Sequence, residues 1–423
     1  MAREMKDSGI EWIGEIPIDW GITSLKHLCK MRAGKTLTSE QISQEGRYPV
    51  YGGNGIRGFY EEFNNEGTYL LVGRQGALCG NVHKVEGRFW ATEHAVIVCI
   101  NNNCDIDYMY YILIGLNLNR YASNTAAQPG LAVNTILNVK TCIVQRGEQQ
   151  KIALFLSRKC AELDNVLEKT RASIEEYKKL KQAVITQAVT KGVRGDREMK
   201  DSGVEWIGEI PIEWELAPFR HVLKERQEKN SPIKSVERLS LSIDLGVTLY
   251  AEKTTNLDRF KDDFQQYKLA HEGDLVMNSM NMIVGATGVS DYFGCVSPVY
   301  YTFYDELEDH VTAKYCEYIF RSKTMLRVLY SLGKGIYAIV RGDDRVNTCR
   351  LKVSKEDLKS IIIPVPPVEE QREIVNYLKK KCLAIDELIT RKEQYLSEIE
   401  NYKKSLIYEY VTGKREVPQK YQA

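Results

Sequence analysis

The 423-residue sequence lacks the features that mark membrane, secreted or strongly basic proteins. No apolar run reaches 18 residues, and the start does not follow the pattern of a signal peptide. Ten cysteines are scattered with no Cys-x-x-Cys pair, so neither a zinc site nor a disulfide framework is expected. The net charge of +1 disfavours a bulk polyanion binder but allows local basic patches. We expect a cytoplasmic protein with reduced thiols.

Catalytic motifs are also missing. The sequence has no GxxxxGK[ST] phosphate loop, no glycine-rich loop of a methyltransferase, and only one Pro-Pro pair, Pro366-Pro367. Glu4-Met5-Lys6 and its copy Glu198-Met199-Lys200 resemble a nuclease carboxylate-x-lysine pair, but the first copy has no upstream acid to complete a metal site. The six histidines are isolated, and we interpret Glu93-His94 as structural. We predict no catalytic residue, metal or cofactor in this chain.

What the chain does contain is an internal duplication. Residues 3–20, REMKDSGIEWIGEIPIDW, return at 197–214 with sixteen of eighteen positions identical. Residues 148–164 align with 370–386 at a shift of 222, which also places Lys181 on Lys403 and Ile185 on Ile407. The stretches between the repeats, 21–147 and 215–369, are not similar to each other. The order is short repeat, variable domain, helical repeat, and then the same again.

The helical repeats at 148–192 and 370–413 are predicted to be long helices. Residues 149–191 contain neither proline nor glycine, and a helix of about 42 residues would span about 60 Å. Apolar residues follow steps of three and four, which is typical of a coiled-coil seam. A core helix within a globular domain is the alternative. The seam residues are Leu156, Leu163, Ile174, Tyr177 and Val184 in the first copy, and Leu378, Ile385, Leu396, Ile399 and Leu406 in the second.

Duplication favours a pseudo-two-fold arrangement in which the two helices pack antiparallel as a spacer. The variable domains would then lie at opposite ends of the pair. The short repeat, with two tryptophans and three isoleucines around a proline, is predicted to be extended and anchored. Its second copy follows helix one, so by symmetry the first copy should lie beside the end of helix two. The predicted architecture is α+β and quasi-circular.

Both variable domains are predicted to be mixed α/β with glycine-rich turns between short strands. Examples are 48–60, 68–82 and a strand at 89–100 in the first domain, and 272–290, 294–303 and the basic loop 331–347 in the second. Arg, Lys, Asn and Gln at such tips can contact base edges or phosphates, although each turn alone could simply be a hairpin. The candidates are Lys35, Asn54, Arg57, Arg74, Gln75, Asn278, Asn281, Lys334, Tyr337 and Arg341.

These segments resemble the DNA-specificity subunit of type I restriction-modification systems over nearly the whole chain. The most specific segment is IIIPVPPVEEQREI at 361–374, which is similar to the proline-rich segment at the end of a recognition domain. The motif EWIGEIPxxW is similar to the segment that precedes a recognition domain. The first copy, CIVQRGEQQKI at 142–152, departs by lacking the double proline. Segments 34–58, 72–76 and 273–300 are also similar to parts of such domains.

The resemblance implies that each target-recognition domain reads one half of a split, asymmetric double-stranded DNA site, with the helices fixing the unread gap. It implies two modification subunits that use S-adenosylmethionine for adenine methylation, and restriction subunits that use ATP and magnesium for translocation and cleavage. Two alternatives stay open: a coiled-coil adaptor that binds proteins, and a specificity subunit of a methylation-only system. The DNA sequence itself is not readable from side chains whose docking register is unknown.

Overall fold

The computed structural model describes residues 3–76, 79–123, 130–253, 263–307, 309–336 and 350–421. The chain divides into two compact units. Unit 1 contains residues 1–172 and 393–423, and unit 2 contains residues 173–392. Each unit therefore holds one short repeat, one variable domain and a part of each long helix. No described helix is long and apolar enough to cross a membrane.

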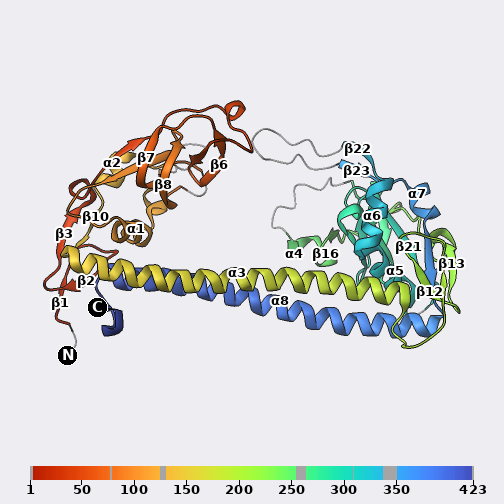
Figure 1. Cartoon of the computed structure of the whole chain (residues 1–423). Helices are drawn as coiled ribbons and strands as arrows, with labels where there is room; N and C mark the ends of the chain where they lie inside the picture. The colour runs from red at the N-terminus through yellow and green to blue at the C-terminus, as the bar shows by residue number, and fades with distance from the viewer. Residues whose placement is uncertain are drawn as a thin grey trace. The chain divides into compact units, whose positions relative to one another are not determined.

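The two predicted helices are α3 (Arg146–Lys191) and α8 (Val368–Val411), each beginning two residues before its expected start (Figure 1). Both run without proline, and α8 begins directly after Pro366-Pro367, where the fixed backbone of proline suits a helix start. Each helix is followed by a glycine with positive φ, Gly192 at 76° and Gly413 at 71°. A glycine in this position lets the backbone reverse after the last turn.

Within each unit α3 and α8 are antiparallel, as predicted. In unit 1, Asp164 pairs with Lys403 (2.6 Å) and Arg171 with Glu400 (2.6 Å). In unit 2, Lys181 pairs with Asp386 (2.6 Å). The Asp164–Lys403 and Lys181–Asp386 pairs are one interaction seen twice, because both partners are related by the 222-residue shift. All ten predicted seam residues are buried or half-buried.

Each short repeat folds as a small hairpin against the ends of the long helices. In unit 1, β1 (Met5–Asp7) pairs with β2 (Glu15–Pro17); in unit 2, β11 (Met199–Asp201) pairs with β12 (Glu209–Pro211) in the same register. The Tyr408 hydroxyl near the end of α8 donates to the Ile13 carbonyl at 3.0 Å. The expected position of the first copy, beside the end of helix two, is thus confirmed.

Each hairpin is held to the start of a long helix by the same set of contacts, which we call the clasp. In it, an arginine of the hairpin pairs with a glutamate of the helix and lies over a tryptophan ring. In unit 2, Arg197 reaches Glu370 at 2.5 Å and lies over the Trp214 ring, whose Nε1 donates to the same carboxylate at 3.0 Å. In unit 1, Arg3 reaches Glu148 at 2.9 Å and lies over the Trp20 ring. Arg3 and Arg197 stand at one repeat position, as do Glu148 and Glu370.

The first variable domain is built on a six-stranded sheet in the order β4-β9-β7-β8-β5-β6. Its first and last strands, β3 (Gly21–Ser24) and β10 (Lys140–Ile143), pair antiparallel beneath it, so the chain enters and leaves at one place. The remaining elements are β4 (Cys29–Ala33), β5 (Tyr48–Gly52), β6 (Gly55–Tyr60), β7 (Asn65–Gly73), β8 (Val82–Ala91), β9 (Ala95–Ile100), α1 (Ile106–Gly115) and α2 (Val133–Leu137).

The second variable domain has different sheets but the same closure. Its first and last strands, β13 (Glu215–Pro218) and β24 (Ile362–Val365), again pair antiparallel. A four-stranded sheet has the order β14-β21-β18-β19. The other elements are β14 (Lys224–Glu225), β15 (Leu239–Ser242), β16 (Gly246–Leu249), α4 (Tyr250–Lys253), β17 (Lys268–Ala270), β18 (Leu275–Asn278), β19 (Thr287–Val289), β20 (Gly294–Val296), β21 (Tyr300–Tyr304), α5 (Val311–Arg321), α6 (Lys323–Leu332), β22 (Lys334–Ile336), β23 (Arg350–Lys352) and α7 (Lys355–Ser360).

In each unit the hairpin, the domain and the helix ends share one core. Ile13, Trp20, Ile112, Leu156 and Val411 belong to a single buried cluster in unit 1. Unit 2 has the matching cluster, formed by residues such as Ile207, Trp214, Val189, Ile319 and Leu378. Burial of large apolar side chains is the main stabilising contribution to folding. The loops of each variable domain are therefore mounted on a well-packed base.

One strand prediction was wrong. Residues 89–100 were expected to form a single apolar strand, but β8 ends at Ala91 and β9 begins at Ala95. Thr92–His94 form a tight turn, in which the Ala95 N–H donates to the Thr92 carbonyl at 3.0 Å. The apolar residues on both sides hid this turn, which contributes to the site described below.

The two clasps should differ in energetic weight. The Glu370 side chain is 2% exposed and that of Glu148 is 31% exposed. Removing one partner of a buried ion pair costs about 3–5 kcal/mol, whereas exposed pairs contribute about 1 kcal/mol or less. We expect Glu370→Ala to lower the free energy of unfolding by about 3 kcal/mol or more in urea denaturation. The matched Glu148→Ala should lower it by about 1 kcal/mol. Equal losses would contradict this assignment.

Candidate nucleic-acid interface

Two glycines in the first domain, Gly53 and Gly73, lie where separate loops come into contact. The hairpin between β5 and β6 turns at Gly53-Asn54, and a Cβ on Gly73 would lie 1.9 Å from the Gly53 carbonyl oxygen. A Cβ on Gly53 would lie 3.3 Å from the His94 carbonyl oxygen and 3.5 Å from that of Gln75. At Gly73 only a residue without a side chain permits this approach, whereas at Gly53 a Cβ would be in tight but not overlapping contact. We call residues 53–54, 74–76 and 92–94 the domain-one loop cluster.

Strand β8 curves to bring its end into this cluster. Strands β7 and β8 pair from Val72↔Val82 to Asn65↔Phe89, with Gly67 opposite Gly87. Both glycines have positive φ (123° and 92°), which breaks the regular extended backbone. Ala91 accepts a hydrogen bond from the Lys35 N–H at 2.9 Å, and the Thr92 N–H donates to the Tyr51 carbonyl at 2.9 Å. The sheet therefore folds back on itself beside β5.

Three of the five residues predicted in this domain, Asn54, Arg74 and Gln75, lie in this cluster, and Arg57 and Lys35 lie on segments that adjoin it. Asn54 lies at the hairpin tip, where its Oδ1 accepts from Asn81 Nδ2 at 2.8 Å. Arg74 and Gln75 follow β7, and the Arg74 N–H donates to the His94 carbonyl at 2.9 Å. The Arg57 side chain passes over Gly52 at the base of the tip. Lys35 stands next to the end of β8. Arg74 is half-buried and the other four are exposed.

His83, Glu93 and His94 lie beside these loops, although sequence reasoning named none of them as a DNA-contact candidate and interpreted Glu93-His94 as structural. His94 Nε2 lies 3.2 Å from Glu93 Oε1, and the His83 ring lies next to Gly55. Burial lowers the pKa of His83, which favours the neutral imidazole. Among the described residues, His83 Nε2, Thr92 Oγ1 and Glu93 Oε2 are buried without a hydrogen-bond partner. The cluster thus offers cations, amides and uncommitted polar atoms over a short distance.

In the second domain fewer of the predicted residues lie together on the surface. Asn281 is exposed in the turn after β18, and its carbonyl accepts from the Ala286 N–H at 3.1 Å. Asn278 is buried, at 7% exposed, and its Oδ1 accepts the Met280 N–H at 3.1 Å. The Asn278 side chain therefore stabilises the turn rather than pointing at a ligand, and we no longer assign it a DNA contact. Tyr337 and Arg341 lie outside the described residues.

Four lysines gather next to this turn, and we call them the domain-two lysine patch: Lys268, Lys334, Lys352 and Lys355. The Val353 N–H donates to the Ser279 carbonyl at 3.1 Å, which places the end of β23 against the turn. Lys334 is opposite Lys352 in the β22–β23 pair. Lys268 Nζ donates to the Tyr300 carbonyl at 2.8 Å, and Tyr300 is opposite Asn278 in the sheet. Only Lys334 of this patch was predicted.

The lysines are only partly neutralised. Lys355 Nζ lies 2.6 Å from Glu225 Oε1, and Lys334 Nζ lies 3.0 Å from Asp357 Oδ2. Burial, and then the positive charge of Lys355, lowers the pKa of Lys268. A bound anion would relieve this repulsion. Met280, Val284 and Val299 are exposed by 42%, 49% and 39% beside the patch, so apolar contacts are available as well.

Each domain thus presents a different surface, with side chains of the types that can bind nucleic acid. Arginine and the amides of Asn and Gln can make bidentate contacts to guanine and adenine, and apolar side chains can contact the thymine methyl. Lysines neutralise backbone phosphates and set register. No cluster of His, Cys, Asp or Glu that could hold a metal ion occurs in the described ranges.

Comparison with known proteins identifies the family to which this chain belongs. The family described as the type I restriction modification DNA specificity domain matches residues 17–176 and 341–401, just over half of the chain. The chain belongs to this family.

Two curated relatives illustrate the match. The type I restriction enzyme EcoprrI specificity subunit of Escherichia coli is 43% identical over 139 residues, covering 32% of this chain and 34% of that protein. That match therefore spans about a third of the relative. The putative MjaX specificity subunit of Methanocaldococcus jannaschii is 24% identical over 95% of each chain.

A solved structure shows the same fold. It was determined in work on complex assembly and conformational transition of the type I R-M system. That chain superposes with a TM-score of 0.63 at 13% identity, covering 94% of this chain and 98% of its own. The α+β architecture with long helices is thus confirmed.

Arg74 in the domain-one loop cluster gives the sharpest test of direct readout. If Arg74 contacts a base, Arg74→Ala should cost about 1–3 kcal/mol of discrimination and relax one position of the recognised site. The measurement is DNA affinity and the methylated motif of the assembled complex. Arg88→Ala is the control, because Arg88 pairs with Glu66 (2.9 Å) at the bend of the β7–β8 hairpin. An unchanged motif and affinity would remove Arg74 from the interface.

Lys352 tests the phosphate contacts of the second domain. It is exposed. Lys352→Ala should weaken binding to all DNA sequences alike and reduce the slope of log K against log salt by about 0.9. Lys224→Ala serves as the control, because Lys224 is opposite Tyr304 at the other end of β21 from Tyr300. A loss confined to one DNA sequence would instead indicate a base contact.

Proposed function

We propose that this chain is the specificity subunit of a type I restriction-modification complex and reads a split, asymmetric double-stranded DNA site. The first recognition domain reads one half-site and the second reads the other. The long helices fix the length of the unread gap. The observation that carries the proposal is the mounting of two dissimilar loop-bearing domains on two copies of one frame, in a member of this family.

The catalytic steps belong to partners in this proposal. Two modification subunits supply S-adenosylmethionine and methylate adenine, and restriction subunits supply ATP- and magnesium-dependent translocation and cleavage. This chain itself binds no cofactor and works in the cytoplasm. Its own contribution is to select the DNA and to position the partners on it. Its contacts with base edges distinguish one DNA sequence from another, and each good bidentate contact contributes about 1–3 kcal/mol to this discrimination.

A domain exchange tests the assignment of half-sites. Residues 21–143 run from β3 to β10, whose pairing closes the first domain at its base. Replacing this segment with the corresponding segment of another family member should keep the clasp and the long helices intact. We expect the assembled complex to methylate a motif in which one half-site has changed and the other has not. Sequencing of methylated adenines in the host genome measures the motif.

The reciprocal exchange of residues 215–365, from β13 to β24, is the matched control. It should change the other half-site. If either exchange altered both halves, or if the wild-type complex showed no split motif, the proposed function would fail.

A further inference from the structure

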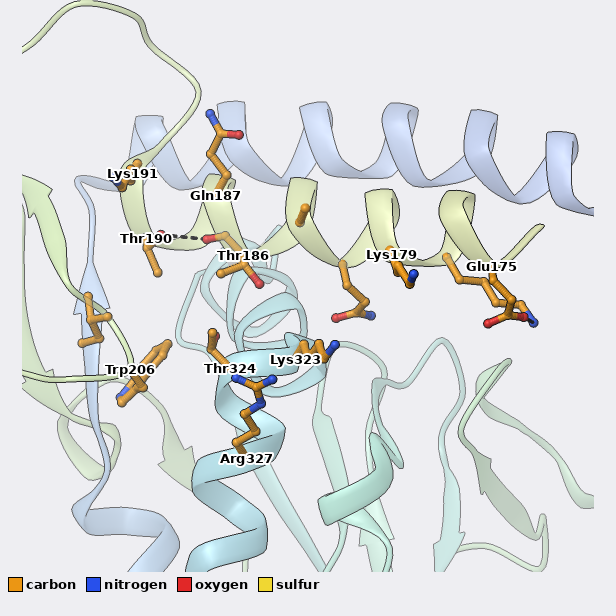
Figure 2. Close-up of a pocket in the computed structure, with 14 residues that line it drawn as sticks. Glu175, Lys179, Thr186, Gln187, Thr190, Lys191, Trp206, Lys323, Thr324 and Arg327 are labelled. Carbon is orange, nitrogen blue, oxygen red and sulfur yellow. Dashed lines mark hydrogen bonds and ion pairs between the residues drawn. The ribbon is translucent and has the colours of Figure 1, made fainter. Parts of the chain in front are cut away.

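The second unit contains an open groove between its long helix, its short repeat and α6. The groove has a volume of about 1030 Å³, and a second hollow of about 450 Å³ adjoins it. Trp206, Thr324 and Arg327 line both hollows. Figure 2 shows Lys179 and Thr186 of α3 facing Lys323, Thr324 and Arg327 of α6, with Trp206 at one end. The volume of the larger hollow equals that of the largest small-molecule sites, so a polypeptide segment can enter it.

The walls of the groove are basic and its remaining surface is partly apolar. Lys323 and Arg327 are exposed, and neither has an ion-pair partner among the described residues. Of the other charged lining residues, Lys178 pairs with Glu175 at 2.9 Å, Lys179 pairs with Glu176 at 2.8 Å, and Lys191 lies 3.7 Å from Glu209. Glu175 is the acidic residue that lines the larger hollow, and Glu205 is the one that lines the smaller hollow, so cations outnumber carboxylates in the lining. Trp206, Ile207 and Ala183 supply the apolar surface.

The corresponding place in unit 1 is filled. Trp12 occupies the repeat position of Trp206, and its ring contacts the Tyr408 ring with centroids 6.5 Å apart. The Arg120 guanidinium lies 5.6 Å from the Trp12 ring centroid. Trp12 Nε1 is buried, and the Tyr408 hydroxyl closes onto the Ile13 carbonyl.

A single helix position accounts for much of this difference. The 222-residue shift places Tyr408 on Thr186. The alignment is firm in space, because Thr412 and Thr190 each donate to the carbonyl of the preceding turn, at Tyr408 (2.6 Å) and Thr186 (2.8 Å). The aromatic ring fills the space beside Trp12. The smaller threonine leaves the space beside Trp206 open.

We propose that the groove of unit 2 binds an acidic segment of the modification subunit, so that the two copies of the frame hold that partner with unequal affinity. This inference rests on the proposed function and adds to it where the partner docks and how its two copies differ. The first modification subunit occupies unit 2. The second binds the filled surface of unit 1 more weakly, and the complex assembles in order.

The chemistry of the groove favours a protein segment over nucleic acid. A phosphate backbone needs rows of cations and gains little from Trp206, Ile207 and Ala183. Tryptophan and arginine side by side are the residues most enriched at the centres of protein interfaces. Carboxylates of the partner would pair with Lys323 and Arg327, while an apolar residue of the same segment covers Trp206.

The test is a titration of the full-length chain with purified modification subunit, followed by calorimetry and native mass spectrometry. We expect two binding steps whose dissociation constants differ at least tenfold. Lys323→Glu with Arg327→Glu should weaken the tighter step at least tenfold and leave the weaker step unchanged. Thr186→Tyr, which copies the filled state of unit 1 without changing charge, should weaken the same step. Added salt should affect the tighter step more.

Lys404→Glu is the matched control, because exposed Lys404 occupies in unit 1 the position of Gln182 in unit 2. It should leave the tighter step unchanged. If both unit 2 variants bound two modification subunits as the wild type does, the groove assignment alone would fall. If they lost DNA affinity but kept partner binding, the groove would serve nucleic acid and the assignment would also fall. A wild-type chain that bound no modification subunit would overturn the proposed function as well.

Discussion

The fold depends on one clasp, in which an arginine of the short repeat lies over a tryptophan and reaches a glutamate in the first turn of a long helix. In unit 2 this joins Arg197, Trp214 and Glu370, and Gly192 lies so close that a Cβ there would meet the Arg197 side chain. A buried carboxylate is stable only when its charge is paired and its oxygens accept hydrogen bonds. Glu370 meets both conditions, and so it fixes the end of α3, the hairpin and the start of α8 at a single point.

Anchoring at that point leaves the inserted domains free to differ. Each domain begins and ends in a paired strand, β3 with β10 and β13 with β24. The first strand of each pair directly follows the tryptophan of the clasp in the sequence. The shared core continues from the hairpin into each domain, so stability comes from residues that the recognition loops do not use. The loops can therefore carry glycines and exposed polar or cationic side chains such as Gln75, Lys35 and Arg57, which would be costly in a core.

The repeated parts could be predicted from the sequence because identity and periodicity report directly on them. The proline-free helices and their apolar seams follow from local pattern, and the position of the first short repeat beside the end of α8 follows from symmetry. The hairpin pairing of the short repeat was not predicted, because the sequence indicated only an extended, anchored segment. Asn54, Arg74 and Gln75 were also found together, with Arg57 and Lys35 on adjoining segments, because the glycines between them are a local signal for close-approaching turns. The single strand predicted at 89–100 failed where apolar residues flank a three-residue turn.

The second interface could not be predicted in the same way. Lys268 and Lys355 are far apart in the sequence, but both lie over the Tyr301 ring, at 5.9 and 5.8 Å. No spacing rule connects them, because the sheet that brings them together is set by tertiary packing. Asn278 shows the converse error: its residue type suits base recognition, but burial commits its side chain to the Met280 N–H. Side-chain identity selects candidates, whereas burial and hydrogen bonding decide among them.

The duplication also sets what the two halves can and cannot share. The short repeats differ at two of eighteen positions, so any partner meets nearly the same hairpin twice. The helix beside each hairpin has diverged further, with Tyr408 in place of Thr186, and the adjoining domain supplies Arg120 in one unit and Arg327 in the other. A binding free energy is the sum over the whole contact surface, and a difference of 1.4 kcal/mol is already a tenfold difference in affinity. In the proposed assembly, nearly identical hairpins with unlike neighbours would give one partner two sites of different strength.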